Sequence, residues 1–171
     1  MKFTKLPENT FEELQLNAGI LLSTFTPSSA TVEDSNILGA TSGGVSFSDT
    51  PTYQDFGDDI DNCPKNTKEL KRIESRDIKI SGTFLTVNTA RAKSLIAAAD
   101  IDSIDATKIT PRDTLASADF SDIWWVGDYS DKNGATNGGY IAIHLKNALS
   151  TGGFSIQSGD KAKGQFAFEY T

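Results

Sequence analysis

One stretch, residues 76–100, constrains the fold more than any other, because its hydrophobic period changes from that of a strand to that of a helix. Residues 76–84 alternate between apolar and polar side chains, which is typical of a strand with one buried face. The apolar set is Ile78, Ile80 and Phe84 with the small Gly82 between them, and the polar set is Lys79, Ser81 and Thr83. The stretch therefore begins as a half-buried strand.

Beyond Asn88 the apolar residues recur at helical spacing. Positions i, i+3, i+4 and i+7 of one stripe are Ala92, Leu95, Ile96 and Ala99. Asn88 or Thr89 can cap the start, since a short side-chain oxygen accepts a free backbone N–H there. The sequence predicts one well-formed helix that packs this stripe on a sheet. Thr10 and Glu13 have the capping-box spacing of a single further helical turn.

Most of the remaining chain has the pattern of short strands joined by turns. Pro51 interrupts one alternating run, which suits a bent strand or an edge strand, and the glycines of residues 39–44 suit a close backbone approach or a bulge. Further strands are expected at residues 121–129, 140–149, 154–158 and 164–171, and residues 101–121 are expected to be irregular. The expected class is α+β: a mainly antiparallel β-sandwich or half-open barrel of seven or eight strands with one flanking helix, in a single domain over residues 1–171.

A long hairpin arm with a charged tip is expected around residues 50–70. A connection of this length is commonly functional. Its acidic residues come first and its lysines follow: Asp55, Asp58, Asp59, Asp61, then Lys65 and Lys68. The acidic cluster does not match the calcium-loop spacing. We interpret these charges as a solvated tip or as a charge contact with another subunit, rather than as a metal site.

The sequence offers little for catalysis. His144 is the only histidine, the only cysteine is Cys63 in an acidic neighbourhood, and no Gly-x-Ser-x-Gly motif occurs. Asp55-Phe56-Gly57 spells a kinase triplet without the other kinase motifs. We therefore expect that the protein is not an enzyme and that it binds no metal and no cofactor. The enzyme alternative that remains open is glycosidase chemistry by a pair of carboxylates.

Charge and hydropathy limit the partners. The net charge of −7 argues against a protein that grips nucleic acid by its phosphates, but it suits a wall past which nucleic acid slides. One cysteine allows no intrachain disulfide, and the opening residues have no apolar run long enough for a signal peptide. The longest apolar run, residues 18–22, is too short to span a bilayer. These features predict an intracellular protein with no membrane partner.

Two apolar segments suggest contacts with other surfaces. Residues 20–22 are a continuous apolar run, either a strand buried on both faces or part of a segment that docks on a neighbouring subunit; the docking candidates are Leu16, Ile20, Leu21 and Leu22. Trp124 and Trp125 are adjacent and must point to opposite faces of their strand. Either both faces of that sheet are covered, or one Trp is the exposed platform of a carbohydrate- or ligand-binding module.

Four stretches, in this order, together resemble the major tail (tail tube) proteins of long, non-contractile-tailed bacteriophages and prophages of Gram-positive bacteria. They span nearly the whole chain: FEELQLNAGILLSTF (11–25), LGATSGGVSF through ISGTF (38–84), TARAKSLIAAAD (89–100) and GDKAKGQFAFEYT (159–171). The tube protein of type VI secretion is a weaker alternative.

The resemblance implies a structural virion protein that forms hexameric rings. Such rings stack into a hollow tube through which DNA leaves the capsid, and inner strands of the six subunits pair into one barrel. It implies tape-measure and tail-terminator partners, a location in the phage tail, and synthesis in the bacterial cytoplasm. On this reading the arm contacts the adjacent ring, residues 16–22 dock on a neighbour, and Lys79, Ser81 and Thr83 line the channel.

Overall fold

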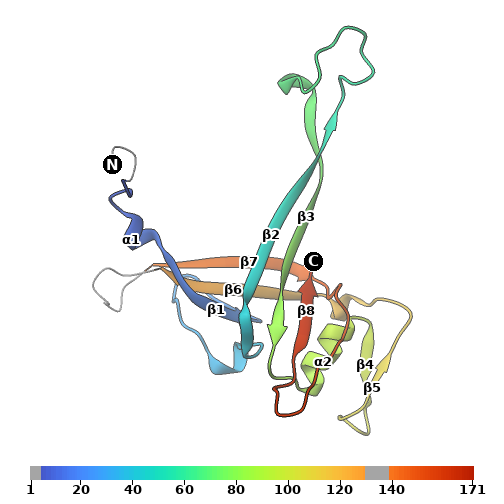
Figure 1. Cartoon of the computed structure of the whole chain (residues 1–171). Helices are drawn as coiled ribbons and strands as arrows, with labels where there is room; N and C mark the ends of the chain where they lie inside the picture. The colour runs from blue at the N-terminus through green and yellow to red at the C-terminus, as the bar shows by residue number, and fades with distance from the viewer. Residues whose placement is uncertain (1–4, 130–138) are drawn as a thin grey trace.

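The computed structural model describes residues 5–129 and 139–171, and these ranges contain eight strands and one main helix (Figure 1). The strands and helices, in chain order, are α1 (Thr10–Glu13), β1 (Gln15–Leu22), β2 (Thr41–Asp55), β3 (Lys71–Phe84), α2 (Thr89–Ile96), β4 (Ala99–Ile101), β5 (Ile109–Pro111), β6 (Ser121–Tyr129), β7 (Tyr140–Ala148) and β8 (Phe166–Tyr170). Short 3₁₀ turns lie at Asp34–Asn36, Lys68–Leu70 and Ser117–Asp119.

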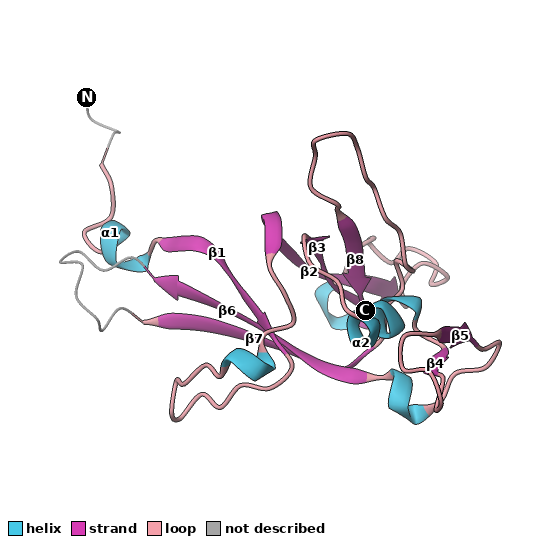
Figure 2. Ribbon diagram, turned by 90° about the horizontal axis from the view of Figure 1, so that it is seen from below, coloured by secondary structure: helices cyan, strands magenta, loops and turns pink. Residues whose placement is uncertain are grey.

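The strands form two three-stranded sheets and one small hairpin, and every paired strand is antiparallel. One sheet has the order β1-β6-β7, the other has the order β2-β3-β8, and β4 pairs with β5. In Figures 1 and 2, β6 and β7 run across the foot of β2, β3 and β8, and α2 lies beside β8. The predicted class, mainly antiparallel β with one helix, is confirmed.

The main core lies between the two sheets and the helix. Its buried members come from β1, β3, α2, β6, β7 and β8, with Ala148 at the end of β7: Leu21, Ile80, Phe84, Leu95, Ile123, Leu145, Ala148, Phe166, Phe168 and Tyr170. The alternation predicted for β8 is confirmed, because its three aromatic residues all face this core. Leu95 is the fully buried residue of α2, so the helix closes the core as a brace.

A second apolar cluster covers the opposite face of the β1-β6-β7 sheet. Leu22, Phe25 and Val126 are its buried members, and Trp124 packs against them. Trp125 packs on the main core instead. Both faces of this sheet are thus covered within the chain itself, which agrees with the opposite orientations expected for the two Trp side chains.

Helix α2 begins as predicted but ends earlier. The Asn88 side chain caps it by accepting a hydrogen bond from the backbone N–H of Arg91 at 2.8 Å. The helix stops at Ile96, because Ala97 takes a positive φ of 69° and turns the chain into β4. Ala99, predicted as the last residue of the helical stripe, is fully buried but belongs to a strand.

Three other expectations are wrong. Residues 99–111 contain the β4-β5 hairpin, because Arg112 ties this region together through Asp100 (2.8 Å) and the buried Asp119 (2.6 Å). Residues 154–158 form no strand and contribute a single bridge between Gln157 and Gln165. The α1 turn exists, but its cap position is Asn9 with no side-chain cap, so the Thr10 capping box does not form.

None of the helices in the described ranges has the length and apolar composition needed to cross a membrane.

Candidate functional site

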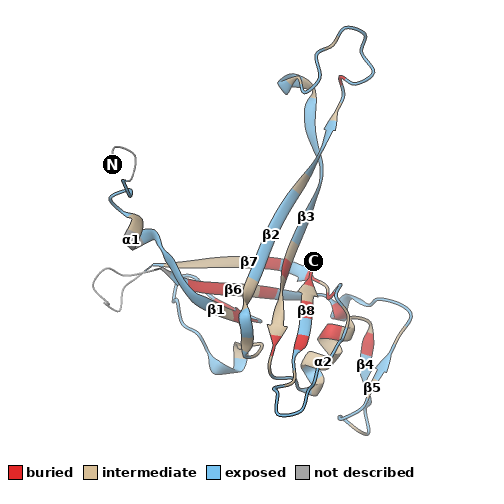
Figure 3. Cartoon of the chain, viewed as in Figure 1, coloured by how far each residue is buried: buried red, intermediate tan, exposed pale blue. Residues whose placement is uncertain are grey.

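The feature that sets this molecule apart is the hairpin formed by β2 and β3. Strand β8 pairs with β3 only over residues 80–84, so beyond Ile80 the two long strands continue without a third. They project from the body as an arm that ends in the loop of residues 56–70 (Figure 1). Figure 3 shows that the arm is almost entirely exposed. The predicted hairpin is therefore confirmed, with strand pairing that extends from Thr41 to Asp55 on one side.

Directly paired residues of an antiparallel hairpin share a face, so the register divides the arm into two surfaces. We define the apolar arm face as Phe47, Ile78, Pro51, Tyr53 and Ile73. Asp49 and Arg76 also lie on this face, where they neutralise each other in an ion pair of 2.6 Å. The apolar arm face is continuous with the core, because Phe47 pairs directly with the fully buried Ile80.

A β-bulge keeps the apolar side chains on one face. Thr52 pairs with Ser75 but Tyr53 pairs with Ile73, so Glu74 is an extra residue in β3. If Glu74 were instead paired with Tyr53 in a regular ladder, Ile73 would point to the opposite face, since a shift of one residue reverses every side chain. The side chain of Lys71 confirms the assignment, because its Nζ lies 5.0 Å from the centre of the Tyr53 ring.

The apolar arm face is exposed in the isolated chain. Tyr53 and Ile73 are 53% and 50% exposed, and Phe47 and Ile78 are 41% and 37% exposed. In the tip, Phe56 and Ile60 are also more than half exposed. Single exposed apolar residues are ordinary on a protein surface, whereas a larger exposed apolar area is typical of interaction sites. All six of these residues lie on one hairpin and its tip.

The opposite surface of the sheet, the polar arm face, is rich in hydroxyl groups. Its members on the two strands are Ser46, Ser48, Thr50, Thr52, Gln54, Arg72, Ser75, Asp77, Lys79, Ser81 and Thr83. The three predicted channel residues, Lys79, Ser81 and Thr83, do share this face. Lys79 Nζ lies 3.2 Å from the carboxylate of Asp77, so part of its charge is neutralised locally.

The acidic cluster in the tip does not act as a unit. Both carboxylate oxygens of Asp55 accept backbone hydrogen bonds, from Gly57 at 3.0 Å and from Asn66 at 2.8 Å. These bonds, Gly57 first, lower the pKa of Asp55. Asp55 therefore shapes the tip, whereas the other predicted contact residues of the tip are exposed: Asp58, Asp59, Asp61, Lys65 and Lys68. No group of three His, Cys, Asp or Glu in residues 5–129 and 139–171 is arranged to hold a metal ion.

The residues considered for catalysis or stacking make contacts within the chain itself. His144 stacks on Trp124 with ring centres 3.9 Å apart, and its Nε2 lies 3.0 Å from Asp122. The indole N–H of Trp125 donates to the Ala18 carbonyl at 3.1 Å. Cys63 is half-buried inside the tip. Neither Trp is an open platform, because Trp124 is covered by His144 and Trp125 packs on the core.

The predicted docking segment divides into two parts. Leu21 and Leu22 are fully buried in the chain's own two clusters, which favours the alternative of a strand buried on both faces. Ile20 is half-buried, and Leu16 is 48% exposed. Within this segment, Leu16 is therefore the residue most accessible to a neighbour.

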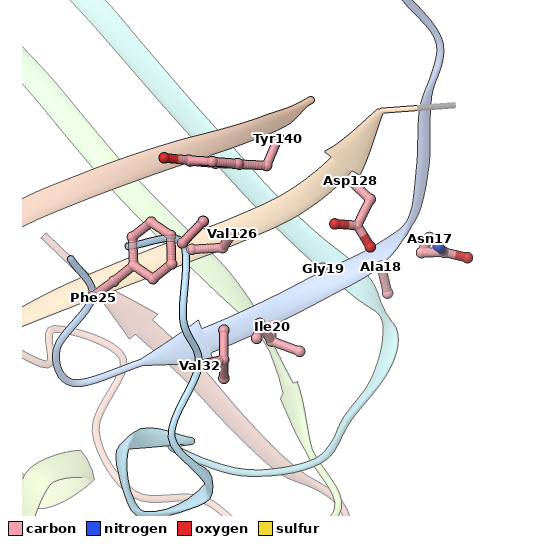
Figure 4. Close-up of a pocket in the computed structure, with 10 residues that line it drawn as sticks. Asn17, Ala18, Gly19, Ile20, Phe25, Val32, Val126, Asp128 and Tyr140 are labelled. Atoms are coloured by element: carbon pink, nitrogen blue, oxygen red, sulfur yellow. The ribbon is translucent and has the colours of Figure 1, made fainter. Parts of the chain in front are cut away.

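A pocket of about 340 Å³ lies beside β1 (Figure 4), and no pattern in the sequence indicates it. Strand β1 bulges there: Leu16 pairs with Asp128 and Ile20 with Val126, so residues 17–19 stand opposite Gly127. The walls of the pocket combine the β1 bulge, the loop after β1, and strands β6 and β7. Its apolar lining is Ile20, Phe25, Val32 and Val126, and Asn17 and Asp128 lie at one end (Figure 4).

The bulge is fixed by backbone conformations that sequence patterns do not reveal. Asn17 and Gly19 have φ values of 67° and 68°. A Cβ at Gly19 would lie 2.6 Å from the Trp125 ring, so only glycine fits between the bulge and this side chain. Tyr140 holds the outer loop by donating its hydroxyl to the Pro27 carbonyl at 2.7 Å.

Comparisons with family models, with curated proteins and with solved structures find no match.

Proposed function

We propose that this chain is a self-assembling structural subunit that forms rings, and that the rings stack into a tube of the phage-tail type. The observation that carries the proposal is the arm, whose apolar face extends beyond the core and is exposed among the residues that the structure describes. An exposed apolar series of this length is expected on a subunit that is buried in an assembly. The hexameric ring size follows from the sequence resemblance alone.

The arrangement of the strands supports lateral association. The sheet orders put β2 and β7 at sheet edges, and an edge strand offers a row of backbone N–H and C=O groups to a neighbouring strand. Pairing of β2 with a strand of the next copy would extend the β2-β3-β8 sheet around a ring. Its polar face would then line the inside of that ring, where water and a passing polymer are the neighbours.

The chemistry of the polar arm face suits a channel that DNA passes without being held. Hydroxyl groups dominate it, and Lys79 is paired with Asp77. A net charge of −7 for the whole chain adds repulsion toward phosphate groups. Lys79, Ser81 and Thr83 are accordingly our candidates for the channel wall. The tape-measure and tail-terminator proteins, and a location in the phage tail, belong to the same proposal.

The direct test is the state of the purified chain as its concentration rises. We expect a monomer when dilute and rings or tubes when concentrated, because association follows mass action. Light scattering after size exclusion gives the mass, and electron microscopy of negatively stained samples gives the shape. A chain that remains monomeric at millimolar concentration, with neither rings nor tubes, would end the proposal.

A second candidate function rests on the pocket beside β1. Its volume of about 340 Å³ is at the lower end of small-molecule sites, and its apolar walls with polar groups at one end have the usual character of such sites. A soluble ligand-binding module would stay monomeric and would bind a small apolar ligand there. The concentration series distinguishes the two functions, since a binding module has no reason to form rings.

A further inference from the structure

We propose that the apolar arm face, rather than the charged tip, is the surface by which one copy of this chain binds a second copy, and that the pocket beside β1 of the second copy receives it. The inference rests on the proposed function and deepens it by naming both halves of one contact. Tyr53 and Ile73 would supply the centre of the inserted face. Ile20, Phe25, Val32 and Val126 would form the receiving surface.

The bulge at Glu74 is the first step of the argument. An arm that contacted its partner through tip charges alone would have no need for side chains sorted along its length. Here the extra residue restores the apolar alternation after the pairing of Thr52 with Ser75, and so places Ile73 beside Tyr53 on one face. Apolar side chains are therefore kept on one face of the arm as far as Tyr53 and Ile73, close to the base of the tip.

The exposed area is the second step. With roughly 200 Å² for each large side chain, the four large residues of the apolar arm face present about 360 Å², and the apolar residues Phe56 and Ile60 of the tip bring this to about 600 Å². Specific interfaces bury about 800 Å² on each partner. The apolar side chains would thus supply most of one such surface. Each copy would contribute one arm and accept another, so every copy would be held twice.

The geometry excludes contact of the arm with its own pocket. About nine residues of each strand extend past the body, a length of roughly 30 Å at 3.3 Å per residue. The arm points away from the body that contains β1 (Figure 1). A straight two-stranded ribbon cannot fold back on its own sheet, so the insertion has to occur between copies. Such a head-to-tail contact generates closed rings or open stacks.

The pocket matches the arm in size and in charge. A cavity of 150 Å³ can hold a benzene molecule, so about 340 Å³ accommodates the Tyr53 ring with part of Ile73. Lys71 accompanies Tyr53 on the arm, 5.0 Å from its ring centre. Asp128 stands at one end of the pocket. Insertion of Tyr53 would bring these opposite charges toward each other.

The first experiment compares two neighbouring residue pairs that differ only in the face they occupy. The variant Tyr53→Ser/Ile73→Ser removes the centre of the apolar arm face. The control Thr52→Ala/Ser75→Ala changes the adjacent pair on the polar arm face. We expect the first variant to weaken self-association roughly thirtyfold or more, the usual effect of losing central anchors, and the control to assemble like the parent. A third variant, Lys65→Ser/Lys68→Ser, should also assemble.

The second experiment tests the receiving pocket by cross-linking. In a Cys63→Ser background, one chain carries Tyr53→Cys and another carries Val32→Cys, an exposed pocket residue. Mild oxidation of the mixture should give a disulfide-linked dimer of the two chains, whereas Thr52→Cys in place of Tyr53→Cys should give none. Assembly without this cross-link, in tubes that still require Tyr53 and Ile73, would overturn the pocket as the receiver.

The outcomes separate this inference from the proposed function. If the parent chain never associates, the proposed function fails. If the parent forms rings or tubes and Tyr53→Ser/Ile73→Ser forms them equally well, the proposed function stands and the apolar arm face is overturned as the contact. If only Lys65→Ser/Lys68→Ser loses assembly, the charged tip is the contact instead.

Discussion

Strands β2 and β3 run through both the body and the arm of this protein, and what covers them differs between the two regions. In the body, Ile80 and Phe84 of β3 are fully buried between the two sheets. On the same face of the arm, Tyr53 and Ile73 are half exposed. Alternation thus produces one apolar face along the whole hairpin, but the described part of the chain covers only the base of that face. The comparison shows that the same alternation leads to burial or to exposure depending on what packs on the hairpin, and our proposal assigns the exposed part to a partner.

The largest loss of stability is expected at a fully buried residue of the main core. Leu95→Asp places a carboxylate in the main core, where Leu95 is fully buried. Losing the packed side chain and burying a charge together should lower the free energy of unfolding by about 4 kcal/mol or more. Circular dichroism should show an unfolded chain at 37 °C.

A matched substitution in the same helix serves as the control. Ala90 is exposed in the first turn of α2, where a negative charge is favourable. Ala90→Asp should therefore change stability by no more than about 0.5 kcal/mol. If Leu95→Asp melts like Ala90→Asp, the helix does not close the core.

A smaller loss is expected at the edge of the core. A Cβ on Gly82 would lie 2.8 Å from the Phe168 ring, which the main core holds in place. Gly82→Val should lower the free energy of unfolding by about 1–3 kcal/mol through overpacking. Chemical denaturation measures it, with Thr83→Val, the adjacent change on the polar arm face, as the control. Equal stability of the two variants would mean that β8 does not pack closely on β3.

The tip should respond to acid through Asp55. Two backbone N–H groups bind the ionised carboxylate of Asp55 and lower its pKa. Their contribution is present above the ordinary pKa of about 3.9 and is lost as the pH falls through the lowered value. Protection of the Gly57 and Asn66 amides from hydrogen exchange, measured against their intrinsic rates at each pH, should therefore decrease below about pH 4.

Asp55→Asn tests the origin of that response. An amide has only one acceptor oxygen, so exchange at one of the two N–H groups should already be fast at pH 6. Asp59→Asn, an exposed neighbour in the tip, should behave like the parent. An acid response that persists unchanged in Asp55→Asn would assign it to another group.

The smallest effect on stability is expected on the polar arm face. Ser81 is half-buried on this face, where it pairs with Ser46 and with Glu169. Ser81→Lys should change the free energy of unfolding, measured by thermal denaturation, by no more than about 0.5 kcal/mol. In assembled tubes the added positive charge should increase the retention of short DNA fragments. An unfolded Ser81→Lys variant would place this face in a core.

Much of the framework was predictable because it depends on local chemistry. The Asn88 cap, the alternation of β3 and β8, the edge position implied by Pro51 and the bulge implied by the glycines before Val45 all appear in the structure. Each depends on residues that are neighbours in sequence or across one turn. Such signals need no knowledge of the rest of the fold.

The missed elements depend on contacts between distant residues. The β4-β5 hairpin is held by Arg112 through Asp100 and Asp119, and the residue pattern of its own short strands does not predict it. The pocket depends on the β1 bulge, which lies against Trp125 more than a hundred residues away. The extra residue Glu74 is visible only once β3 is paired with β2. Periodicity within a single segment cannot show any of these features.

By itself the sequence determined which side chains share a face, since alternation follows from backbone geometry alone. Ile78 and Ile80 are the clearest case: they are two residues apart on one strand and indistinguishable in pattern. Only the tertiary structure decided that Ile80 is fully buried and Ile78 is 37% exposed. Burial depends on where the β1-β6-β7 sheet and α2 stop, so the boundary between core and arm is set by the partners of a strand and not by the strand.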